Sequence, residues 1–246
     1  MSGHNKWSQI KRQKGAADVK RGMAFTKLTK AVTLAAKQGG GDADTNFKLR
    51  LAIDKARAAN MPKDNIARAI KRGTGELGGA QLEEITYEAY GPAGTAYLIE
   101  TLTDNRNRTV QEVKGVLTKY GGRLGEAGTV AWMFETKGII HAGAKGLSAE
   151  QAEETIIESG ADDYNEMDGI YFIYTAPKEL ESVKNYISNQ NFEIESAEIT
   201  MEPKNSVQID SKSAAEQVIR FVEKLEELDD VSQVYSNFDI DEDLLN

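Results

Sequence analysis

The uneven distribution of charge constrains this chain more than any other feature of its sequence. Residues 1–75 contain 17 Lys and Arg against five Asp and Glu, a net charge of +12. Residues 76–246 contain 13 against 34, a net charge of −21. This asymmetry predicts a basic module that binds a polyanion, attached to an acidic body. The net charge of the whole chain, −9, conceals the division.

Length and composition exclude several classes of protein. The 246 residues, 40% of them hydrophobic, indicate a globular protein with two or three domains. The absence of cysteine excludes disulfides, zinc–thiolate sites, iron–sulfur clusters and a cysteine nucleophile. No apolar run reaches the ~18–20 residues of a membrane span, and the polar, basic start of the chain does not resemble a secretory signal. We therefore expect a soluble, cytoplasmic protein.

Three short helices are predicted in the basic segment. They run over about 16–37, then from a cap at Asp44 or Thr45, and from Pro62 to Gly73. The first helix carries an apolar stripe at spacings of three and four, and a lysine row on roughly the opposite face. The stripe is Phe25, Leu28, Val32 and Ala35, and the row is Lys20, Lys27, Lys30 and Lys37. This helix is therefore expected to bury one face and to expose a row of ammonium groups.

A basic arm precedes this lysine row and contains an aromatic residue. Lysine and arginine would meet phosphates, while His4 and Trp7 would reach bases or a groove. The residues expected to contact nucleic acid are His4, Lys6, Trp7, Lys11, Arg12, Lys14, Lys20, Arg21, Lys27 and Lys30. The alternative is a merely solvated face, which the excess of cations disfavours. Changing Lys20, Lys27 and Lys30 to Glu is expected to abolish binding and to leave thermal stability nearly unchanged.

The acidic body alternates strands and helices. A hairpin is predicted around Gly91–Gly94. Residues 134–202 follow the order strand, helix, strand, strand, helix, strand once a short strand is placed near 162–165, and this βαββαβ order is ferredoxin-like. A strand–helix–strand unit follows over about 207–237. Three helix starts in the body are predicted by capping boxes, which pair Thr109 with Glu112, Ser148 with Gln151, and Ser213 with Glu216.

Two loops contain motifs with more than one interpretation. Gly73, Gly75 and Gly78 match the dinucleotide-binding pattern GxGxxG, but a helix precedes them and a strand follows, so we interpret the segment as a linker. Arg106 and Arg108 lie where a strand is predicted to end and a helix to begin. They are a second candidate anion site, and a capping loop is the equally weighted alternative.

Signals for catalysis or for a bound cofactor are weak. The two histidines, His4 and His141, fall in different predicted domains and do not have the spacing of metal ligands. The motifs of serine hydrolases, Walker A nucleotide sites and zinc proteases are not found. We therefore expect a non-enzymatic protein with no metal and no cofactor.

Five motifs resemble those of the YebC/PmpR family over nearly the whole chain. They lie at Gly3–Trp7, Lys20–Leu28, Ala59–Gly73, Tyr87–Pro92 and Asp104–Thr109. The first reads GHNKW, where the family has GHSKW. The resemblance implies an α+β fold of three domains. These are a basic helical module over 1–79, a discontinuous α+β domain over 80–133 plus 205–246, and an inserted ferredoxin-like domain over 134–204.

The resemblance also implies a function. The usual family label is a probable DNA-binding transcriptional regulator. The alternative is a ribosome-associated translational activator that binds RNA and relieves stalling at proline-rich stretches, since a mitochondrial relative activates translation of cytochrome c oxidase. The expected partner is therefore DNA, or ribosomal RNA and the ribosome, with no membrane contact, and the chain is expected to be a monomer, with an oligomer left open. A ligand-sensing or enzymatic body and a protein–protein adaptor remain the other hypotheses.

Overall fold

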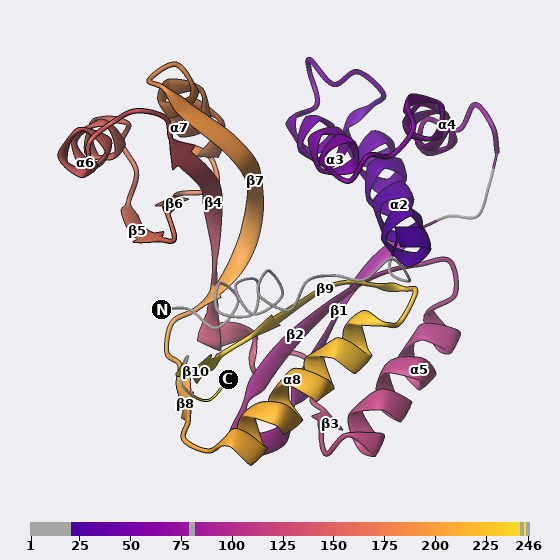
Figure 1. Ribbon diagram of the computed structural model, residues 1–246. Coiled ribbons are helices and arrows are strands. Elements are labelled where there is room, and N and C mark those ends of the chain that lie inside the picture. Colours follow the sequence, from indigo (N-terminus) through magenta and orange to yellow (C-terminus); the bar gives the residue numbers. More distant parts are fainter. Residues whose placement is uncertain (1–20, 79–81, 242–243, 245–246) are drawn as a thin grey trace. The chain divides into compact units, whose positions relative to one another are not determined.

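The computed structural model describes residues 21–78, 82–241 and 244. The fold is α+β, and the chain divides into two compact units (Figure 1). The first unit comprises Met1–Phe134 and Pro203–Asn246, and the second comprises Glu135–Glu202. The second unit is thus an insertion in the first. The further division of the first unit into a helical module and an α+β domain stays a prediction.

In residues 21–78, the described N-terminal stretch of the first unit, the chain forms three helices, as predicted. Their bounds are α2 Arg21–Gly39, α3 Phe47–Ala58 and α4 Lys63–Gly73. Val32 and Ala35 of the predicted stripe are buried in the core that the three helices share, and Phe25 and Leu28 pack against it. The end of α4 lies so close to α2 that a Cβ at Gly73 would collide with the carbonyl oxygen of Thr33. The predicted apolar stripe of α2 is therefore confirmed.

The Gly-rich segment is a connection between a helix and a strand. Gly73 is the last residue of α4, and the next strand begins at Glu83. Gly75 and Gly78 have φ angles of 86° and 63°, which glycine adopts at little cost. A dinucleotide site needs the order strand, glycine loop, helix, and this order is the reverse.

Asn46, and not Asp44 or Thr45, caps α3. Its Oδ1 accepts a hydrogen bond from the Leu49 N–H at 3.1 Å, and its Nδ2 donates to the carbonyl oxygens of Ala35 and Gly40, both at 2.8 Å. The side chain thus serves the end of α2 and the start of α3 at once. Asp44, Thr45 and Asn46 are all residue types that cap helices well. The contact of the Asn46 amide with the end of α2 selects Asn46.

Replacing Asn46 with Ala is expected to lower the free energy of unfolding by about 2 kcal/mol, because a helix cap is lost and two carbonyl groups lose their donor. Urea denaturation followed by circular dichroism measures this change. Asp44→Ala, at an exposed position two residues away, is the control and should change stability by less than about 0.5 kcal/mol. Equal effects of the two substitutions would contradict the role given to Asn46.

The α+β part of the first unit is a four-stranded antiparallel sheet covered on one face by two helices (Figure 1). The strand order is β3-β1-β2-β9. The bounds are β1 Glu83–Tyr90, β2 Ala96–Thr103, α5 Arg106–Lys119, β3 Arg123–Leu124, α8 Lys212–Glu226 and β9 Val231–Ser236. The short strands β8 Val207–Ile209 and β10 Phe238–Ile240 pair in parallel. Tyr97, Ile99, Leu117 and Phe221 belong to the core between the sheet and the helices.

The hairpin between β1 and β2 is confirmed, and its turn is a short 3-10 helix at Pro92–Gly94. Of the three capping boxes, Ser148 with Gln151 is confirmed. The other two predictions were wrong, since α5 begins after Asn105 and α8 begins after Ser211. At α5 the reason is tertiary, because the Thr109 side chain is buried and bonds to Thr103 and to Asp230.

The second unit has the predicted βαββαβ order. Its sheet is ordered β5-β6-β4-β7, the arrangement of a ferredoxin-like domain. The bounds are β4 Phe134–Ala144, α6 Ala149–Glu158, β5 Asp163–Met167, β6 Ile170–Thr175, α7 Leu180–Ser188 and β7 Phe192–Pro203. A short 3-10 helix, Ala131–Met133, precedes β4. His141 is buried in this sheet, with its ring against Phe172 and its Nδ1 3.0 Å from the Ser196 hydroxyl.

Candidate functional site

A buried carboxylate lies where the helical part of the first unit meets the α+β part. Asp230 immediately precedes β9, and its side chain is 2% exposed. It accepts hydrogen bonds from four groups in three different segments. The donors are Lys30 Nζ of α2 at 2.6 Å, Arg108 Nη2 at 2.7 Å and Thr109 Oγ1 at 2.6 Å, both of α5, and Thr103 Oγ1 of β2 at 3.1 Å.

These partners keep the carboxylate ionised. Burial by itself would raise the pKa of Asp230, but the hydrogen bonds from Lys30, Thr109 and Arg108 outweigh it and hold this pKa well below its ordinary value. The same contact, together with Asp104 at 2.9 Å, raises the pKa of the Arg108 guanidinium. The junction therefore contains a permanent negative charge neutralised by two cations, one of which comes from the helical part.

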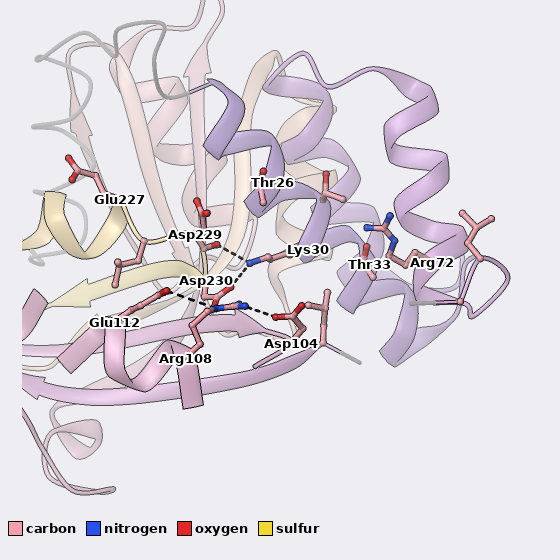
Figure 2. A pocket seen from close by; sticks show the side chains of 15 residues that line it. Thr26, Lys30, Thr33, Arg72, Asp104, Arg108, Glu112, Glu227, Asp229 and Asp230 are labelled. Atoms are coloured by element: carbon pink, nitrogen blue, oxygen red, sulfur yellow. Dashed lines mark hydrogen bonds and ion pairs between the residues drawn. The ribbon is translucent and has the colours of Figure 1, made fainter. Parts of the chain in front are cut away.

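A cleft of about 890 Å³ opens beside this junction (Figure 2). Helix α2 contributes Lys30 and a row of three threonines to one wall, and Arg72 of α4 lines the same side. The facing wall is formed by α5, the end of β2 and the turn before β9. It contributes Asp104, Arg108, Glu112, Glu227 and Asp229. The cleft thus has a basic wall and a predominantly acidic wall.

Two lysines of the α2 row meet this acidic wall, so the prediction of a free solvent-exposed row was wrong. Lys27 Nζ donates to the carbonyl oxygen of Glu226. Lys30 Nζ donates to the Asp229 carbonyl oxygen at 3.1 Å as well as to Asp230, and it is 20% exposed. Lys37, although exposed, donates to the carbonyl oxygen of Leu82 at 3.2 Å. The face of α2 opposite the helical core thus contacts segments distant in the chain.

The contact of Lys30 with Asp230 also contradicts the expectation that charge reversal of the lysine row leaves thermal stability nearly unchanged. Substituting Lys30 with Glu would place a second carboxylate beside the buried carboxylate of Asp230. Charge reversal of Lys20, Lys27 and Lys30 is therefore expected to lower thermal stability. Weaker nucleic-acid binding by that variant would not separate the removal of phosphate contacts from damage to the junction.

Most of the other residues expected to contact nucleic acid lie outside the described residues. They are His4, Lys6, Trp7, Lys11, Arg12, Lys14 and Lys20. Arg21 is the first described residue of α2. At the second candidate anion site, Arg108 pairs with three carboxylates, those of Asp230 at 2.7 Å, Asp104 at 2.9 Å and Glu112 at 4.0 Å. Asn105 caps α5, as the capping alternative requires. Arg106 is exposed at the start of α5. Burial raises the pKa of Tyr87, and the charge of Arg106 offsets this rise only in part.

Helices α3 and α4 carry cations that the sequence-based site did not include. Residues 21–78 contain 12 Lys and Arg against five Asp and Glu. The spacing of these cations in the sequence could have revealed them, because residues three or seven apart lie on the same face of a helix. Lys48 and Lys55 are seven residues apart, and Arg68 precedes Lys71 by three. Arg57 lies 3.9 Å from Asp54 of the same helix, and both side chains remain largely exposed. The exposed cations on α3 and α4 are Lys48, Lys55, Arg57, Lys63, Arg68, Lys71 and Arg72.

The part of the chain that the structure describes offers little for other chemistry. Within it, no group of three His, Asp or Glu side chains is placed to hold a metal ion. No helix in the same ranges is long and apolar enough to cross a bilayer.

Comparison with known proteins places the chain in a family. The profile of the TACO1/YebC N-terminal domain matches residues 5–76, and that of the TACO1/YebC second and third domain matches residues 82–238. This chain belongs to the TACO1/YebC family. The profile boundary falls in the segment that joins α4 to β1, so the α2–α4 helices correspond to the family's N-terminal domain.

Relatives cover the chain almost from end to end. A probable transcriptional regulatory protein of Geobacter sulfurreducens is 54% identical over 98% of this chain and 96% of its own length. One of Fusobacterium nucleatum is 47% identical over 100% of this chain and 98% of its own. The crystal structure of a conserved hypothetical protein from Aquifex aeolicus, 46% identical, superposes with a TM-score of 0.85 over 93% of this chain and 94% of that one.

Proposed function

We propose that this chain is a nucleic-acid-binding regulator of gene expression, a DNA-binding transcriptional regulator of the cytoplasm that carries out no catalysis. The observation that supports it best is the cationic surface of α3 and α4, in a family whose relatives are named probable transcriptional regulatory proteins. Seven exposed Lys and Arg side chains on two short helices suit a polyanion, and the imbalance of charge makes a merely solvated face a poor explanation.

The proposed contact surface combines two sets of residues. The first is the exposed set on α3 and α4. The second is the set predicted from the sequence, the basic arm with Trp7, which would add stacking or groove contact, and the cations Lys20 and Arg21 that follow the arm. Lys27 and Lys30 can join only when they leave their oxygen acceptors at the junction. Because residues 76–246 have a net charge of −21, a duplex would be repelled by the body and attracted by the helices.

Binding of the full chain to a fluorescent DNA duplex tests this proposal. If about six cations meet phosphates, the logarithm of the association constant should fall with the logarithm of salt concentration at a slope of about −5, which is about a thousandfold between about 50 and about 200 mM salt. Fluorescence anisotropy measures this slope. Absence of binding at low salt, or a slope near zero, would contradict the proposal.

A matched RNA duplex provides the comparison between the two roles of the family. A transcriptional regulator should bind the DNA duplex at least as tightly as an RNA duplex of equal length at the same salt concentration. A clear preference for RNA would contradict the transcriptional role and favour the translational one, because the phosphate charge is matched and only helix shape and the 2′-hydroxyl differ.

A further inference from the structure

We propose that the turn between α8 and β9 is an internal competitor of nucleic acid, which holds Lys27 and Lys30 of α2 until a polyanion displaces it. This inference rests on the proposed function and concerns its regulation. The turn, here Glu226–Asp230, offers oxygen acceptors to α2 in place of phosphates. Figure 2 shows the acceptors that Lys30 meets, at Asp229 and Asp230. The closed junction would therefore withhold part of the cationic surface.

The turn acts through oxygens from both backbone and side chain. The carbonyl oxygens of Glu226 and Asp229 accept from Lys27 and Lys30, and the Asp230 carboxylate accepts from Lys30 at 2.6 Å. The Lys30 ammonium group thus meets an anionic oxygen, as a phosphate would provide, and the Lys27 ammonium group meets a carbonyl oxygen. Lysine binds phosphate as a compact point charge and does not require bidentate geometry. The lysines can therefore exchange the oxygens of the turn for those of a phosphate without a specific geometry.

The junction can open without leaving a buried charge unsatisfied. When Lys30 departs, Asp230 keeps Arg108, Thr109 and Thr103 as donors, and all three belong to the α+β part with it. A buried carboxylate that lost its only cation would make opening very costly. Here the remaining guanidinium and two hydroxyl groups hold the anion in the open state as well. The junction therefore has the two satisfied arrangements that a switch requires.

The charges that line the cleft also favour competition between the turn and a polyanion. Its basic wall contains Lys30 and Arg72, while Asp104, Glu112 and Asp229 line the other wall. A polyanion entering the closed cleft would be repelled by those carboxylates. When the helices swing away from the turn, the cations of the basic wall leave the acidic wall together and face the ligand. Apparent affinity then depends on the fraction of molecules that are open.

A chemical cross-link across the cleft tests this inference. Thr26 and Glu227 line the cleft from its two sides, and the natural chain has no cysteine, so Thr26→Cys with Glu227→Cys gives two unique thiols. A flexible bismaleimide locks the junction closed and leaves every lysine intact. The same variant treated with N-ethylmaleimide is the matched control. We expect the locked protein to bind a fluorescent DNA duplex about tenfold or more weakly than the control.

The outcomes separate the inference from the proposed function. Equal or tighter binding by the locked protein would overturn the internal competitor and leave nucleic-acid binding established. No binding by either sample at low salt would overturn the proposed function and the inference with it. If the first pair lowers the melting temperature, Thr29→Cys with Asp229→Cys spans the same cleft and gives the same comparison.

Discussion

Replacing Asp230 with Ala should destabilise the protein by about 3 kcal/mol, more than the alanine substitution at Asn46. The reason is that one carboxylate serves four donors from α2, α5 and β2. Without it, the hydroxyls of Thr103 and Thr109 lose their buried acceptor, and Lys30 and Arg108 lose the counter-charge that they share. Urea denaturation of wild type and variant measures the difference.

A neighbouring substitution provides the control. Asp229 is exposed, and its contact with Lys30 uses the backbone carbonyl, which Asp229→Ala retains. Its effect should stay below about 0.5 kcal/mol. If Asp229→Ala destabilised the protein as much as Asp230→Ala, the effect would come from the charge of the turn and not from the buried network.

The pH dependence of this difference has a defined sign. The pKa of Asp230 is lowered in the folded state, so its contribution to stability is fully present above the unfolded pKa of about 4. It is lost as the pH falls below that value towards the lowered pKa. The gap in free energy between wild type and Asp230→Ala should therefore be constant from about pH 8 to about pH 5 and shrink in more acidic solution. A gap that grew on acidification would contradict the assignment.

Reversing the charge of four cations on α3 and α4 is expected to weaken DNA binding by about 30-fold or more. The positions are Lys48, Lys63, Arg68 and Lys71, all exposed. Each substitution to Glu removes a candidate phosphate partner and adds repulsion, and the salt slope should fall by about one for each phosphate partner removed. Anisotropy titrations at several salt concentrations measure both quantities. The melting temperature should change little, because none of the four side chains is buried.

A second quadruple variant separates local contact from overall charge. Lys114, Lys119, Lys212 and Arg220 are exposed on α5 and α8. Changing them to Glu alters the net charge of the protein by the same amount, at positions outside the proposed surface. Its binding should stay within about threefold of wild type. Similar effects of the two variants would show a general influence of net charge and would contradict the α3–α4 surface.

Local patterns in the sequence predicted the order of elements well. Apolar residues at helical spacing placed α2, and the alternation of strands and helices predicted the ferredoxin-like order that β4 to β7 adopt. Helix starts were less predictable, because Asp44, Thr45 and Asn46 are all good caps by residue type. Asn46 was selected because its amide also reaches the end of α2, which is a tertiary contact.

Composition and residue spacing were enough to predict the charge division, the order of helices and strands, and the face of α2 that is buried in the helical core. These follow from composition and from spacings within a few residues, where backbone geometry alone decides which side chains share a face. The partners of the opposite face of α2 were not predictable and are known only from the folded chain. Lys27 and Glu226 are 199 residues apart, and Asp230 joins donors from three segments. Residue spacing shows which charged side chains share a face of a helix. It does not show which distant segment packs against that face, because packing is a property of the whole fold.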